Sequence, residues 1–192
     1  MSTLFVDTVE PEDVTTTLTL GASGDTVALG AGAVASGFGG GKVLQVLQAT
    51  KTDSETTTTA GWDDVKGLSI AITPSAVTSK VFVMTNVLCV GTVGAAGAWT
   101  NIVRDSTQIA MATSAGSRVA ASAFGYAPDA GDTRHHSTVW LDSPATTSAT
   151  TYKVQFSANG TNTAYINRTE AATDSNAYAR GVSTITVMEI GA

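Results

Sequence analysis

The stretch SKVFVMTNVLCVG, residues 79–91, is the longest run of this chain in which nearly every side chain can be buried. Side chains alternate between the two faces of an extended strand. One face would carry Val81, Val83, Thr85, Val87 and Cys89, and the other would carry Phe82, Met84, Asn86, Leu88 and Val90. A strand with one solvent-exposed face would alternate apolar with polar residues, so this stretch predicts a central strand whose sheet is covered on both sides. Its thirteen residues would extend about 40 Å, so we expect a bulge or bend near Asn86.

Two other stretches share this two-faced apolar pattern: VLQVL at 43–47 and ITVMEI at 185–190. If they join the central strand in one sheet, a second sheet of the same subunit covers one side and something outside the subunit covers the other. Another copy of the chain is the natural cover, because an exposed apolar patch of this kind is a liability on a monomer. The sequence therefore predicts an obligate oligomer whose contact residues are Leu44, Val46, Val83, Val87, Val187 and Met188.

From residue 42 onward, short apolar segments alternate with turn signals, a pattern typical of an antiparallel sandwich or barrel. Charged residues are only 14% of the chain, and Thr, Ser, Ala and Gly dominate, so we expect almost no helix. Asn159-Gly160 is the strongest hairpin signal. About ten strands are predicted, at 42–50, 68–73, 79–91, 99–105, 108–113, 117–126, 134–141, 151–158, 163–167 and 182–190.

The first forty residues have a different composition. Two short alternating segments, 4–9 and 14–20, flank the acidic turn EPED, and the motif LTLGA at 18–22 returns nine residues later as VALGA. Two copies are too few to bury a core of their own, so these segments must pack against other chains. A glycine-rich tract, 30–41, follows. We therefore predict an N-terminal arm and short stem over 1–41 and a β-sandwich head over 42–192.

Several classes of function are unsupported. A net charge of -6 with no cluster of Lys and Arg argues against nucleic acid as a partner. Cys89 is the single cysteine and lies in the central apolar strand, so neither a disulfide framework nor a zinc site is predicted. The start of the chain lacks the features of a signal peptide, and no run reaches the roughly 18 apolar residues of a membrane span.

No catalytic, cofactor or metal site is predicted. The neighbours Asp63-Asp64 would face opposite ways on a strand, which is unsuitable for a paired-carboxylate enzyme. The only histidines, His135-His136, would also diverge, so they could share a metal only across copies around a symmetry axis. Asp129 and Asp132 provide too few oxygens for calcium. Trp99 and Trp140 lie within apolar strands and are expected in the core.

Phrases spread over nearly the whole chain resemble small appendage proteins of tailed bacteriophages, particularly those of marine and cyanobacterial hosts. They are STLFVDT at 2–8, LTLGASGDTVAL at 18–29, KVLQVLQATKT at 42–52, LDSPATTSATTYKVQ at 141–155 and RGVSTITVMEI at 180–190. Such proteins are called tail fibre or virion structural proteins. Their globular ends are similar to the trimeric jelly rolls of the tumour necrosis factor and complement type.

The resemblance implies a homotrimeric jelly-roll head at the virion surface, with a mechanical rather than an enzymatic role. Its partners would be its own copies, other virion proteins bound through the arm, and a host glycan or protein bound at distal loops. A capsid decoration protein that stabilises the head shell is the alternative. Anchoring would fall to Leu4, Phe5, Val6, Val9, Val14, Leu18 and Leu20. Two polar loops, 127–134 and 168–180, would face the receptor with Tyr126, Asp129, Asp132, Asn176 and Tyr178.

Overall fold

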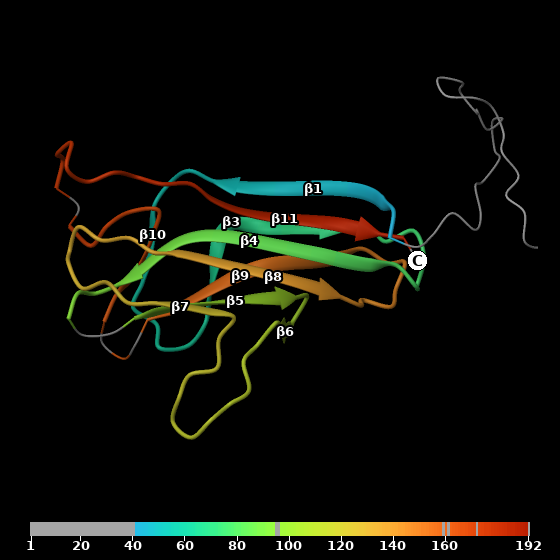
Figure 1. Ribbon diagram of the computed structural model, residues 1–192, viewed down its shortest axis with the longest axis horizontal. Coiled ribbons are helices and arrows are strands. Elements are labelled where there is room, and N and C mark those ends of the chain that lie inside the picture. Colours follow the sequence, from blue (N-terminus) through green and yellow to red (C-terminus); the bar gives the residue numbers. More distant parts are fainter. Residues whose placement is uncertain (1–40, 95–96, 159, 161, 172, 192) are drawn as a thin grey trace, which may run out of the picture. The chain divides into compact units, whose positions relative to one another are not determined.

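The structure, a computed structural model, describes residues 41–94, 97–158, 160, 162–171 and 173–191. These residues form eleven β-strands and no helix (Figure 1). The predicted all-β class is therefore confirmed. The predicted arm and stem, with the seven anchoring residues from Leu4 to Leu20, lie outside the described residues except for Gly41.

The strands form two antiparallel sheets. The first sheet has the order β1 (Val43–Lys51), β11 (Ser183–Ile190), β4 (Lys80–Gly91), β10 (Ala164–Ile166) and β2 (Glu55–Thr57), and β8 (His135–Asp142) also pairs with β4. The second sheet has the order β3 (Asp63–Ile72), β9 (Thr150–Ala158), β5 (Ala98–Arg104) and β6 (Thr107–Ile109), and β7 (Ala123–Gly125) also pairs with β5. Figure 1 shows β1, β11, β4 and β8 side by side in the first sheet.

The strand predicted to be central occupies that position. β4 pairs with β11 along one edge, and β11 pairs with β1, so the three two-faced stretches lie in one sheet as predicted. The other edge of β4 pairs with β8 as far as Leu88 and then with β10 from Cys89. The register passes through Asn86 without a break, so the expected bulge there is wrong. β4 accommodates its length by changing partners.

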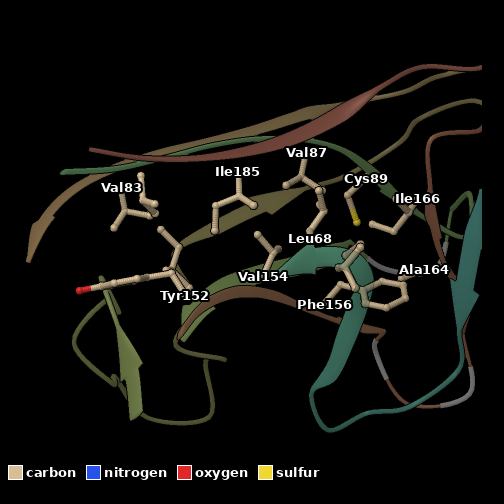
Figure 2. Packing of buried hydrophobic residues seen from close by; sticks show 14 of the residues in the cluster. Leu68, Val83, Val87, Cys89, Tyr152, Val154, Phe156, Ala164, Ile166 and Ile185 are labelled. Carbon is tan, nitrogen blue, oxygen red and sulfur yellow. The ribbon is translucent and has the colours of Figure 1, made fainter. Parts of the chain in front are cut away.

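A single apolar core fills the space between the two sheets. Val83, Val87 and Ile185 of the first sheet meet Leu68 and Val154 of the second (Figure 2). Full burial of each such side chain stabilises the fold by roughly 1.5–3 kcal/mol. A polar cluster lies at the margin of the core. The Tyr152 hydroxyl donates to Asp142 Oδ2 at 2.6 Å, and Arg104 Nη1 donates to the same oxygen at 2.8 Å.

Half of the residues predicted at the contact between copies lie in this core instead. Val83, Val87 and Val187 are each 0% exposed within one subunit and cannot reach a partner. Both faces of β4 and β11 are rich in apolar residues, so the sequence pattern did not tell which face turns inward.

The connection at Asn159-Gly160 is not a hairpin. The strand before it, β9, pairs with β3 and β5 in the second sheet, and the strand after it, β10, pairs with β4 and β2 in the first. The chain therefore crosses between the sheets here. A hairpin does connect β5 to β6, and Asp105 has a φ of 53° in its turn, a conformation that Asp tolerates.

Candidate functional site

The described residues contain no group of three His, Cys, Asp or Glu side chains placed to hold a metal ion. The two adjacent histidines face opposite ways. His136 is buried, with Nδ1 3.1 Å from Thr100 Oγ1, and burial lowers its pKa to about 4. His135 is exposed, with Nδ1 2.9 Å from Asn86 Oδ1. Nor do the described residues include a helix with the length and apolar character of a membrane crossing.

The acidic residues considered as catalytic or calcium-binding candidates have partners in the chain itself. Asp63 accepts from Thr57, and Asp64 accepts from Lys153 Nζ and Gln155 Nε2 at 2.7 Å each. Asp129 accepts from the backbone N–H of Gly131 at 2.9 Å, and Asp132 lies 3.6 Å from Arg134. These contacts are those of structural turns and surface ion pairs.

The first sheet turns an apolar surface away from the core. Its register places Val46, Met188, Phe82 and Leu141 in one row across β1, β11, β4 and β8, and Met84 lies beside Val139 in the next row. Val46 and Leu141 are each 54% exposed, and Val139 is 56% exposed. We call this surface the outer face; its apolar members are Val43, Leu44, Val46, Phe82, Met84, Val139, Leu141, Met188 and Ile190.

The outer face carries almost no charge. Lys80, at its margin, is paired with Ile190, and its Nζ donates to Ser143 Oγ at 2.7 Å. Of the residues predicted at the contact between copies, Leu44, Val46 and Met188 belong to this face. The structure thus separates the predicted set into three outward and three inward residues.

The two loops predicted to face a receptor lie together. The backbone N–H of Ala171 donates to the carbonyl of Ala130 at 3.0 Å, and a Cβ at Gly131 would lie 3.3 Å from the Tyr178 ring. They occupy the end of the sandwich opposite Gly41, whose N–H donates to the carbonyl of Gly191 at 2.8 Å (Figure 1). Four of the five predicted residues are exposed and Asp132 is half-buried. Shallow pockets of about 190 and 310 Å³ lie along residues 168–181.

Asn167 fixes this end of the head. Its side chain is 0% exposed; Nδ2 donates to the carbonyls of Lys51 and Asp53 at 2.8 and 3.0 Å, and Oδ1 accepts from Ser183 Oγ at 2.6 Å. The Ser183 hydroxyl oxygen accepts in turn from the N–H of Leu88 at 2.9 Å. One amide therefore joins β1, β4 and β11 to the loop. The sequence pattern gave no signal for this structural role.

The two tryptophans that were expected in the core lie outside it. Trp140 is 43% exposed and Trp99 is half-buried, so neither is enclosed in the core. Trp140 is paired with Val83, and its exposure follows from the position of β8 at an edge of the first sheet. Trp99 is stacked on Phe124, with 6.3 Å between ring centroids and 30° between planes. This pair lines an open groove of about 680 Å³ that also includes Ser117 and Arg118.

Comparisons with known proteins do not place the chain in a family. No protein-family model matches it, and no curated protein sequence matches it.

Proposed function

We propose that this protein is a structural appendage of a bacteriophage particle, a homotrimer mounted through its N-terminal arm that presents the far end of its head for host attachment. The observation that carries this proposal is the uncharged apolar outer face, which needs a cover. The loops at 127–134 and 168–180 lie at the end opposite Gly41, an arrangement that suits an anchored protein with an exposed tip. The sequence phrases that resemble those of phage appendages agree with it.

The strand order supports a jelly-roll topology. Without β2, β6 and β10, which are three of the four three-residue strands, the sheets have the orders β1-β11-β4-β8 and β3-β9-β5-β7. Eight strands are then divided equally between two packed antiparallel sheets, and the chain passes between the sheets at most connections. This arrangement supports the proposed jelly-roll layout.

Self-association through the outer face follows from its composition. Exposed apolar side chains lie on four adjacent strands of this face. Burying them against another surface removes them from water and so stabilises the assembly. Charged residues are nearly absent there, so identical copies can meet on a symmetry axis without like-charge repulsion.

Mass measurement by light scattering tests the assembly, and we expect three times 19.4 kDa, about 58 kDa, for the full chain. A stable monomer would overturn the trimer.

The virion role is tested by deleting the gene in the phage that encodes it. Particles without the protein should adsorb poorly to their host but stay intact on heating. Normal adsorption with reduced heat resistance would overturn host attachment and favour capsid decoration.

A further inference from the structure

We propose that the groove beside Trp99 and Phe124 binds an acidic saccharide, a sugar unit that carries a carboxylate. The groove lies on the second sheet, and none of its lining residues belongs to the outer face or to the two loops discussed above. Its floor is the pair of adjacent strands β5 and β7, where the register places Trp99 opposite Phe124. The connection from β6 to β7 supplies Ser117 and Arg118, which also line the groove. Figure 1 shows the course of this connection.

The aromatic pair forms a fixed platform. Phe124 is 61% exposed, and exposing that much of a phenyl ring to water is unfavourable. Stacking on Trp99 orients the ring. Gly97 leaves the space that the ring needs, since a Cβ there would lie only 2.3 Å from Phe124 Cε2. Flat aromatic faces at an open site suit the apolar C–H face of a pyranose ring, which removes the exposed aromatic surface from water.

Arg118 gives the groove a positive charge that favours an anionic ligand. The chain has ten Lys and Arg residues, all within the described part. Eight of them have an ion-pair or hydrogen-bond partner for the side chain, and Lys42 also makes an interaction. Arg118 is the exception: its guanidinium has no such partner among the described residues, and no Asp or Glu lines the groove. In a chain of net charge -6, an unpaired guanidinium in an acid-free groove favours an anionic ligand.

The shape of the ligand follows from these two parts. A guanidinium binds a carboxylate through two parallel hydrogen bonds, while the adjacent rings accept the sugar face, and the exposed Ser117 hydroxyl is available for a ring hydroxyl. The Ser122 hydroxyl is already engaged with the N–H of Ile102 at 3.3 Å. A volume of about 680 Å³ is within the range of ligand sites, which is roughly 300–1,000 Å³. A neutral sugar would leave Arg118 unpaired.

Calorimetric titration of the full-length protein with tetragalacturonate, and with the neutral galactose tetrasaccharide as its uncharged counterpart, tests the site. We expect the acidic oligomer to bind at least about ten times more tightly than the neutral one, with an affinity that falls as salt rises. Arg118→Gln should remove this preference. Phe124→Leu should weaken binding of the acidic oligomer about ten-fold through loss of the flat platform. Lys66→Gln, an equal charge change at an exposed lysine elsewhere, should leave binding unchanged.

Three results would overturn the inference: no binding of the acidic oligomer, equal binding of both oligomers, or unchanged binding by Arg118→Gln. A change of oligomeric mass in Phe124→Leu would also overturn it, because the groove would then be a contact between copies. Circular dichroism of each variant checks folding. The titration uses purified protein, so its failure is distinct from failure of the virion role. If the proposed function and the saccharide site both hold, the sugar bound in the groove would identify the class of polymer on the host surface.

Discussion

Glu189 is a carboxylate enclosed by donors at the margin of the core. It is 1% exposed and accepts hydrogen bonds from Gln45 Nε2 at 2.6 Å, from the N–H and hydroxyl of Ser75 at 2.7 and 2.6 Å, and from the Ser79 hydroxyl at 2.7 Å. Burial alone would raise its pKa, but these four bonds outweigh burial and lower the pKa to about 2. The ionised form therefore stabilises the fold.

Glu189→Gln should lower the free energy of unfolding by about 2–3 kcal/mol at pH 7 because an amide cannot accept from all four donors. A carboxyl with a lowered folded pKa contributes stability that is complete above its ordinary value of 4.5 and is lost as pH falls to about 2. The difference between wild type and variant should therefore shrink between pH 4.5 and 2 in urea unfolding. Asp174→Asn, at an exposed position, is the control. A difference that stays constant down to pH 2 would contradict this account.

His136 gives a separate acid response in a higher pH range. Its Nε2 is buried without a hydrogen-bond partner, and burial lowers its pKa from 6.5 to about 4, with a smaller effect from neighbouring His135. The unfolded chain takes up a proton below pH 6.5 and the folded chain does not, so stability falls from pH 6.5 to about 4. We expect His136→Gln to flatten the unfolding free energy over this interval, by up to about 3 kcal/mol. An unchanged slope in the variant would assign the response to other groups.

At the scale of the element, β1, β4 and β11 show what the sequence could and could not predict. Their dense apolar pattern placed them correctly in one sheet. It could not assign the inner face, since Val83 and Phe82 are equally apolar neighbours. The strands β2, β6 and β7 have three residues each, too few for periodicity. The positions of β2 and β7 depend on pairing with strands that are not their neighbours in the sequence. The partners of Glu189, and the two carbonyls to which Asn167 donates, lie more than 100 residues away and left no local signal.

Two substitutions on neighbouring strands of the first sheet distinguish its faces. Val187→Asp would bury an unpaired charge at a 0% exposed site, so we expect unfolded or aggregated protein. Val46→Asp introduces the same charge at a 54% exposed site, so the subunit should fold but the copies should separate. Circular dichroism reports the fold and light scattering reports the mass.

Thr50→Asp is the matched control, because Thr50 is an exposed position of β1 in the polar row with Thr184, Asn86 and Ser137. We expect it to keep both fold and mass. A folded trimer of Val46→Asp would show that the outer face is not where copies meet, and a soluble, folded Val187→Asp would contradict the assignment of the inner face.

At the scale of the whole molecule, the division into an arm and a head stays a prediction, because residues 1–40 lie outside the described residues. The sequence predicted that the two polar loops share one tip, and they do lie together at one end of the sandwich. It could not predict the groove beside Trp99, because its parts come from β5, β7 and the segment between β6 and β7. The expectation that Trp99 is a core residue came from its apolar strand. Only the pairing of β5 with β7 places its ring beside the exposed Phe124.

The head should fold and assemble without the first forty residues. Both sheets and the core between them are built from residues 43–190, and the outer face belongs entirely to the head. A chain of residues 41–192 should therefore melt within a few degrees of the full protein and have three times its own chain mass in light scattering. It should not be incorporated into particles, because the proposed anchoring residues are gone. A monomeric or unfolded truncated chain would assign the assembly to the arm, and incorporation of the truncated chain would assign attachment to the head.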